Sequence, residues 1–183
     1  MKDREPECQY IVYVCPVGEL NQQLELYFAQ SRELFGANKA HQYMPHCTLT
    51  GFFWDLSSSV DFYLDALERA YQEAKPSLTL NVAIERSIFS ETWHGLELQA
   101  DDLKQAIANF ADYEQSSTRQ EPLRLKDWLH LSLAYGFDAR HGSELRQLAQ
   151  KTIDLQADVG WELRFYQKYP DWTWNCLKFW SLS

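Results

Sequence analysis

The chain alternates between short stretches with the hydrophobic pattern of strands and longer ones with the pattern of helices. Runs rich in β-branched and aromatic residues, several with alternating apolar and polar side chains, predict β-strands. They cover residues 9–14, 46–53, 78–84, the hairpin-like pair 87–90 and 93–99, 130–137, 160–166 and 172–182. Apolar residues three or four positions apart predict four amphipathic helices. They cover residues 19–35, 57 to about 75, 101 to about 113 and 143 to about 155.

Strand and helix units recur in both halves of the chain, which predicts an α+β fold. We expect one bilobal domain over residues 1–183, built from two lobes of antiparallel sheet with outer helices. A pseudo-twofold axis would relate the two lobes. The cleft between them would then be the natural place for a functional site.

A short motif occurs once in each half. Residues 46–49 read His-Cys-Thr-Leu, and residues 130–133 read His-Leu-Ser-Leu. Both have the form His-x-Thr/Ser-hydrophobic, and an aromatic run that contains glycine follows each copy. Two such matches among only five histidines are expected by chance in on the order of a few per cent of chains with average composition. The repetition therefore indicates a paired site.

Successive side chains of a strand point to opposite faces, so the first motif predicts which residues share a face. His46, Thr48 and Thr50 fall on one face, and Cys47 and Leu49 fall on the other. A nucleophilic Cys/His pair is thus less favoured than a Cys47 packed in the core.

The second motif behaves in the same way. His130, Ser132 and Ala134 share one face, while Leu131 and Leu133 point into the core. Two strands would therefore each present an imidazole and a hydroxyl group to a common cleft.

The paired motifs resemble the signature of the 2H phosphoesterase superfamily, the LigT-like phosphodiesterases. The likeness runs from about Tyr10 to the C-terminus and includes residues 34–41, 44–49, 52–53 and 129–135. These segments look most like the 2H phosphodiesterase domain of the TULA/Sts (ubiquitin-associated and SH3 domain-containing) proteins. Those proteins also carry ubiquitin-binding, SH3 and phosphatase-like domains, so we expect either a stand-alone relative or an excised domain. Ser132 stands where the family more often has Thr, which keeps the hydroxyl group.

The two histidines suit acid–base catalysis because an unperturbed imidazole titrates near neutrality. His46 and His130 are expected to act as base and acid on opposite sides of a phosphodiester, and the sequence leaves open which is which. Each hydroxyl lies about 6.6 Å along the strand from the histidine of its own motif, too far to be activated as a nucleophile. Thr48 and Ser132 are therefore expected to bind the phosphate oxygens. This scheme requires no metal or other cofactor.

The substrate class follows from the resemblance, because similar proteins act on 2′,3′-cyclic phosphates or 2′,5′-linked ribonucleotides. We expect a hydrolase that opens 2′,3′-cyclic nucleotides, or cyclic phosphates at RNA ends, to 3′-phosphates. Tyr135, Phe52 and Trp93 are the aromatic residues best placed to stack a base, although an aromatic residue taken singly is more often part of the core. A 2′,5′-linked oligonucleotide phosphodiesterase or RNA ligase stays open as an alternative. So does a nucleotide or RNA-end binding module without turnover.

The net charge of −9 limits the classes of molecule that the chain is expected to bind. Proteins that hold long nucleic acid rely on Lys and Arg to neutralise phosphates, so an acidic chain argues for a small nucleotide or a short oligonucleotide. We expect no long duplex, no membrane partner and a monomer. The four cysteines lack C-x-x-C spacing and the charged N-terminus resembles no signal peptide, which predicts a cytoplasmic location.

Overall fold

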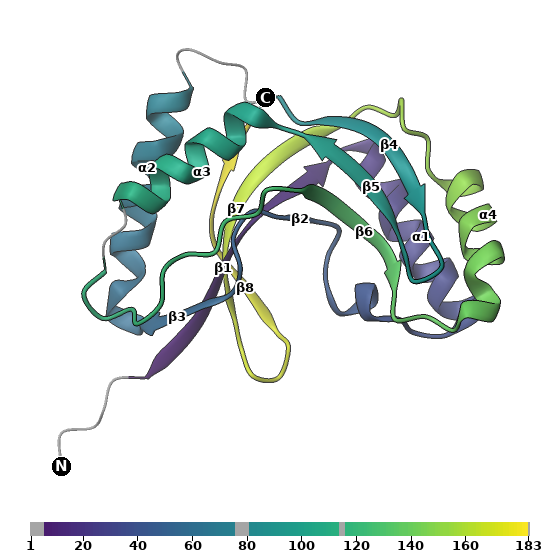
Figure 1. Cartoon of the computed structure of the whole chain (residues 1–183), viewed down its shortest axis with the longest axis horizontal. Helices are drawn as coiled ribbons and strands as arrows, with labels where there is room; N and C mark the ends of the chain where they lie inside the picture. Colours follow the sequence, from purple (N-terminus) through teal and green to yellow (C-terminus); the bar gives the residue numbers. More distant parts are fainter. Residues whose placement is uncertain (1–5, 76–80, 114–115, 183) are drawn as a thin grey trace.

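The computed structural model describes residues 6–75, 81–113 and 116–182. Within these residues, eight antiparallel strands form one twisted sheet in the order β4-β5-β6-β2-β1-β7-β8, with β3 also paired to β1 (Figure 1). The strands are β1 (Glu7–Val17), β2 (Cys47–Thr48), β3 (Phe53–Leu56), β4 (Ala83–Phe89), β5 (Trp93–Gln99), β6 (Leu129–Tyr135), β7 (Gly160–Lys168) and β8 (Trp174–Ser181). The helices are α1 (Glu19–Phe35), α2 (Val60–Ala74), α3 (Asp101–Tyr113) and α4 (Gly142–Thr152), with 3-10 turns at Lys39–Gln42, Ser57–Ser59 and Ala139–His141.

Strand β1 is the centre of the sheet, because it pairs with β7 along one edge and with β2 and β3 along the other. Its β-branched and aromatic residues suit a strand that is buried on both faces. Alternate side chains enter two different clusters. The first cluster takes Tyr10, Val12 and Val14, and the second takes Ile11, Tyr13 and Cys15.

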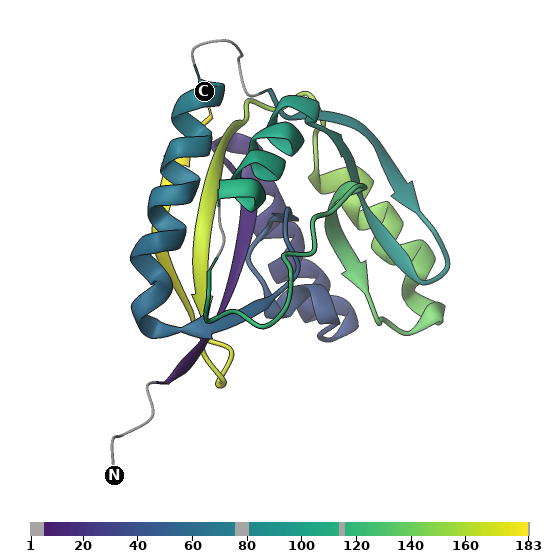
Figure 2. The same ribbon diagram turned by 60° about the vertical axis from the view of Figure 1, so that its left-hand side comes forward.

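All four helices pack on the same face of the sheet as the first cluster, which is the main core. Helices α1 and α4 contact each other, and so do α2 and α3, so the cover consists of two helix pairs (Figure 2). Each helix packs on the sheet through one apolar side, as α1 illustrates. Its buried residues recur at helical spacing along one side, and they are Leu20, Leu24, Tyr27 and Ser31. The opposite face of the sheet carries no helix among the described residues and remains available for a site. No helix in these ranges has both the length and the apolar character needed to cross a membrane.

The structure confirms the α+β class, the antiparallel pairing, the bounds of α1 and the hairpin of β4 and β5. The strands of both halves belong to a single sheet, because β2 pairs with β1 on one side and with β6 on the other. This two-residue strand joins the strands of both halves into one sheet. The pseudo-twofold relation between the halves stays a prediction.

The continuous strand expected over residues 46–53 is wrong in its middle, where the chain bulges. The backbone N–H groups of Leu49 and Thr50 both point to the carbonyl oxygen of Val12, at N···O distances of 3.0 and 3.4 Å. Thr50 consequently turns into the sheet, where its Oγ1 accepts a hydrogen bond from the Val12 N–H at 3.1 Å and its side chain is fully buried. It therefore does not share the face of His46 and Thr48.

The strand expected over residues 78–84 also needs correction. Residues 76–80 lie outside the described part of the chain, and β4 begins at Ala83 and continues to Phe89. A register shift between Ile84 and Arg86 lets this strand pair along its whole length with β5.

Candidate active site

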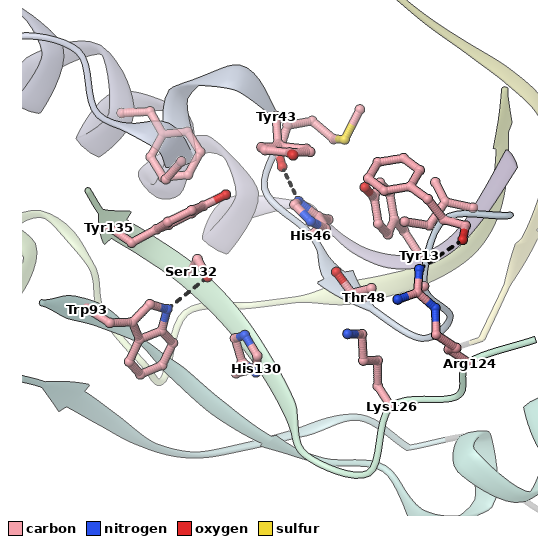
Figure 3. A pocket seen from close by; sticks show the side chains of 16 residues that line it. Tyr13, Tyr43, His46, Thr48, Trp93, Arg124, Lys126, His130, Ser132 and Tyr135 are labelled. Carbon is pink, nitrogen blue, oxygen red and sulfur yellow. Dashed lines mark hydrogen bonds between the residues drawn. The ribbon is translucent and has the colours of Figure 1, made fainter. Parts of the chain in front are cut away.

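A cavity of about 410 Å³ opens on the face of the sheet opposite the main core, and Phe28 of α1 and Ala40 of the first 3-10 turn also line it (Figure 3). Ile11 and Tyr13 of the central strand contribute to its wall, which places it opposite the main core. All seven residues expected from the sequence line this one cavity. They are His46, Thr48, Phe52, Trp93, His130, Ser132 and Tyr135.

The pairing of β2 with β6 explains why the two motifs meet. Cys47 lies opposite Leu131, and both side chains are fully buried in the main core. In an antiparallel pair with this register, His46 lies across from Ser132, and Thr48 lies across from His130. Each histidine thus neighbours the hydroxyl group of the other motif rather than that of its own.

Cys47 itself is a core residue, as expected. Burial raises the pKa of its thiol to about 12, so the thiol stays protonated at physiological pH.

His46 is held in one tautomer. Its Nδ1–H donates to the carbonyl oxygen of Met44 at 2.8 Å, which leaves Nε2 with a free lone pair. The ring packs against Tyr13, with centroids 4.1 Å apart, and against Tyr43 at 5.2 Å. Burial is the main reason that the pKa of His46 falls to about 4; the Met44 carbonyl opposes this shift, and the nearby His130 adds to it. His46 is therefore neutral at pH 7 and able to accept a proton.

His130 sits against two tryptophans. Its ring centroid lies 4.1 Å from that of Trp128 at an interplanar angle of 32°, and Trp93 approaches edge-on at 5.2 Å and 89°. Burial lowers the pKa of His130, and the positive charge of Lys126 acts in the same direction, while the carbonyl of Trp128 opposes it. Both imidazoles thus favour the neutral form in the empty cavity.

Trp93 supports Ser132. Its indole Nε1–H donates to Ser132 Oγ at 2.9 Å, so the serine oxygen accepts this bond and its own hydrogen remains available for a third group. The sequence predicted a stacking role for Trp93. That role stays a prediction, and the structure adds a hydrogen bond that ties the indole N–H to the second motif.

Gly95 makes this position of Trp93 possible. A Cβ atom at residue 95 would lie 2.2 Å from the Trp93 ring and 2.5 Å from the backbone oxygen of Leu131. The strand register also shifts between His94 and Gly95, which brings the indole over the glycine. Only a residue without a side chain fits here.

We expect Gly95→Ala to lower the free energy of unfolding by about 1–3 kcal/mol, the usual cost of overpacking a filled site. Gly142→Ala is the matched control, because a Cβ at residue 142 would make only an ordinary 3.6 Å contact with Phe137. It should cost nothing, since its backbone is helical and Ala favours helix. Urea denaturation followed by circular dichroism measures both. Equal stability of the two variants would contradict the prediction and show that the sheet rearranges to accommodate a Cβ atom at residue 95.

Two basic residues of the cavity were missed from the sequence. The segment before β6 pairs with the bulge after β2: Gly51 N–H donates to the Arg124 carbonyl at 2.6 Å, and Lys126 N–H donates to the Leu49 carbonyl at 3.0 Å. This pairing brings Arg124 and Lys126 to the cavity wall, and Figure 3 shows both side chains beside Thr48. Among the described residues, neither forms an ion pair with a carboxylate. The signal in the sequence was two basic residues in alternation just before the second motif of an acidic chain.

Three tyrosines add neutral hydroxyl groups to the wall. Tyr43 and Tyr135 hydrogen-bond each other through their side chains, and burial together with Tyr43 raises the pKa of Tyr135 to about 12. Burial also raises the pKa of Tyr13. These groups stay protonated and can donate or accept hydrogen bonds. No group of three or more His, Cys, Asp or Glu side chains arranged to hold a metal ion occurs in the described ranges.

The cavity thus combines two neutral imidazoles, the hydroxyl groups of Thr48, Ser132 and three tyrosines, and two cations that have no carboxylate partner among the described residues. Such a set can bind an anion with several oxygens and can move protons on two sides of it. No carboxylate from the described part of the chain lines the cavity.

Comparison with known proteins gives relatives for most of the chain, although no family model matches it. The chain is 33% identical over 163 residues to ubiquitin-associated and SH3 domain-containing protein B of Mus musculus and of Homo sapiens, which covers 87% of the chain and 25% of each relative. It is 29% identical over 202 residues to ecdysteroid-phosphate phosphatase of Drosophila melanogaster, covering 88% of the chain and 26% of that protein. The chain spans about a quarter of the length of these curated relatives. Over most of its own length, it is therefore similar to one part of the ubiquitin-associated and SH3 domain-containing proteins and of an ecdysteroid-phosphate phosphatase.

Proposed function

We propose that this chain is a phosphoester hydrolase of the 2H type, with a pseudo-twofold between its halves. It hydrolyses 2′,3′-cyclic nucleotides, or 2′,3′-cyclic phosphates at RNA ends, to 3′-phosphates without a metal ion. His46 and His130 carry the protons, and Thr48 and Ser132 bind the phosphate.

One observation carries this proposal: two histidines and two hydroxyl groups from segments far apart in the sequence line the same cavity. They lie next to Arg124 and Lys126, which pair with no carboxylate within the described ranges. If the two motifs only stabilised the fold, their polar side chains would not need to line the same cavity. Buried core positions next to each histidine are filled by Cys47 and Leu131, whereas the polar residues all face the opening.

The pKa of about 4 keeps His46 neutral at pH 7, which favours it as the base. Its free Nε2 takes a proton from water while the water oxygen forms the new bond to phosphorus. The bond from phosphorus to the 2′ oxygen breaks, and His130 delivers a proton to that oxygen. A bound phosphate anion stabilises the imidazolium form that His130 needs for this step. Exchange with solvent then returns both histidines to their starting states.

The remaining polar groups stabilise charge. Thr48 and Ser132 donate to the non-bridging oxygens, and the free hydrogen of Ser132 is oriented because its oxygen is already occupied by Trp93. Arg124 and Lys126 supply the positive charge that an acidic protein must concentrate locally to hold an anion.

The names of the relatives support only the broad reaction class. A phosphatase cleaves phosphoesters, and that name belongs to a whole protein of which this chain spans about a quarter. The cyclic substrate comes from the resemblance of the two motifs to the 2H signature, and a small nucleotide also suits a cavity of about 410 Å³.

Chromatographic separation of 2′-AMP and 3′-AMP after incubation with 2′,3′-cyclic AMP in EDTA tests the proposal directly. We expect 3′-AMP as the main product and no loss of rate on chelation. Predominant 2′-AMP would reverse the seating of the sugar and exchange the roles of the histidines. Binding of the nucleotide without any product would identify a binding module instead.

The pH profile of kcat/KM should have its optimum on the acidic side of neutrality. Activity of the free enzyme requires neutral His46, so it rises through the pKa of about 4, and it requires protonated His130, so it falls through a pKa below 6.5. Lys126→Met removes a positive charge that lowers the pKa of His130 and should move the descending limb to higher pH. Initial rates at low substrate from pH 3.5 to 8 measure both curves. An unchanged descending limb in Lys126→Met would contradict the assignment of His130 as the acid.

A further inference from the structure

A second cavity of about 600 Å³ adjoins the first. Phe52 and Arg124 line both cavities, so the two spaces meet at these residues. The rest of its wall comes from the start of β1, from β3 and from residues 118–122. The proposed chemistry uses none of these other wall residues.

Arg124 is placed to bind a group at the junction. Its Nη2–H donates to the Phe52 carbonyl at 3.3 Å, and its side chain lies so close to Gly51 that a Cβ there would be 3.1 Å from Nε. This contact fixes the guanidinium and leaves its other N–H groups without a carboxylate among the described residues. A fixed guanidinium with free donors is a phosphate-binding group.

Trp54 gives the second cavity an aromatic surface. It belongs to β3, lies opposite Gln9 of β1, and is 53% exposed, whereas its neighbour Phe53 is 5% exposed and belongs to the core. An indole this exposed contributes little to the core and offers a face on which a base can stack.

The charges of the second cavity suit one phosphate rather than a run of them. Glu7 and Glu121 line it together with Arg119 and Arg124, so carboxylates balance guanidinium groups. A neutral base and ribose fit this surface, with a single phosphate at the junction. A longer phosphate chain would meet the two carboxylates.

We infer that the preferred substrate is a short oligonucleotide that ends in a 2′,3′-cyclic phosphate, with at least two nucleotides bound. This inference rests on the proposed function. The cyclic phosphate occupies the first cavity beside Lys126 and Arg124. Arg124 borders both cavities and also binds the phosphate that joins the last two nucleosides, and the base of the preceding nucleoside stacks on Trp54. The two cavities together thus hold a dinucleotide.

Three substrates separate the contributions of Arg124 and Trp54 to kcat/KM. They are 2′,3′-cyclic AMP, the same nucleotide with a 5′-phosphate, and CpA ending in a 2′,3′-cyclic phosphate. We expect kcat/KM to rise roughly tenfold when the 5′-phosphate is added, through Arg124. It should rise roughly tenfold again with the second nucleoside, the order that stacking of one base supplies. Arg124→Gln should abolish the first gain, and Trp54→Ala only the second.

Matched controls remove exposed groups that line neither cavity. Phe179→Ala truncates an aromatic side chain of β8 that is 58% exposed, and Arg140→Gln removes a guanidinium that is 84% exposed. Both should keep the two gains. If the wild type hydrolyses all three substrates equally well, the inference is overturned and the proposed function stands.

Calorimetric binding of the 3′-phosphate products distinguishes the remaining outcomes when no substrate is hydrolysed. Tighter binding of CpA 3′-phosphate than of 3′-AMP, lost in Trp54→Ala, would support the two-nucleotide site while the proposed hydrolysis fails. Equal binding of the two ligands would overturn the inference as well.

Discussion

His46→Ala and His130→Ala are each expected to lower kcat on 2′,3′-cyclic AMP by roughly 10²- to 10⁴-fold, the usual loss when a general acid or base is removed. The two residues act on one displacement, so the double variant should be little worse than the slower single variant. Initial rates from chromatographic product analysis measure the loss. Near-normal turnover in either single variant would rule out the two-histidine mechanism.

Folding controls accompany these variants because the ring of His46 packs against Tyr13 and Tyr43. His46→Gln keeps most of the volume and should be equally inactive while its unfolding curve stays close to that of the wild type. His141→Ala is the matched control: this histidine contacts Phe35 and does not line the cavity. Its turnover should be unchanged.

The double substitution Thr48→Val with Ser132→Ala should lower kcat by roughly 10²- to 10³-fold, the order that removal of a preorganised oxyanion donor costs. Both hydroxyl groups contact the phosphate as charge develops, so the rate should fall more than substrate binding. Trp93→Phe keeps an aromatic ring and removes the N–H that Ser132 accepts. It should give a smaller loss that disappears in the Ser132→Ala background, because the indole acts through the serine.

Thr50→Val tests whether turnover depends on the position of a hydroxyl group in the cavity or on any hydroxyl group in this segment. Thr50 lies two residues beyond Thr48, but its oxygen accepts from the Val12 N–H inside the sheet. We expect a loss of about 1–3 kcal/mol in unfolding free energy, since a buried donor is left without its partner, and an unchanged kcat. Thr50→Val should therefore lose stability and keep its kcat, whereas the Thr48→Val/Ser132→Ala variant should lose kcat. Initial rates and urea denaturation of both variants measure the difference. Intact kcat in the Thr48/Ser132 double variant would show that those hydroxyl groups are ordinary strand residues.

The candidate site could be found from the sequence because its central residues follow a local rule. Side chains two positions apart in a strand share a face, so His130 and Ser132 were placed correctly by spacing alone. The same rule failed at Thr50, where a bulge reverses the direction of the side chain. Bulges depend on which strand lies alongside, and spacing within one strand does not contain that information.

Arg124 and Lys126 were missed for a related reason. They reach the cavity through backbone hydrogen bonds between residues 124–126 and 49–51, which are more than 70 residues apart in the sequence. Their alternation before the second motif was the one local signal, and solvated basic residues also show such alternation. The single sheet that joins the two halves was not foreseen either, because it depends on the partners of β2, a strand of only two residues.

The central position of β1 also determines when the protein can be completed during synthesis. This strand lies near the N-terminus, yet its longest partner, β7, follows it by more than 140 residues. At about 5–20 residues per second, a ribosome needs roughly 7 to 30 s to add that length. Through this interval the most apolar strand of the protein can pair along only one of its edges, with β2 and β3. The final fold therefore forms only after the C-terminal hairpin of β7 and β8 has emerged, and until then the nascent chain carries an exposed strand edge that chaperones can protect.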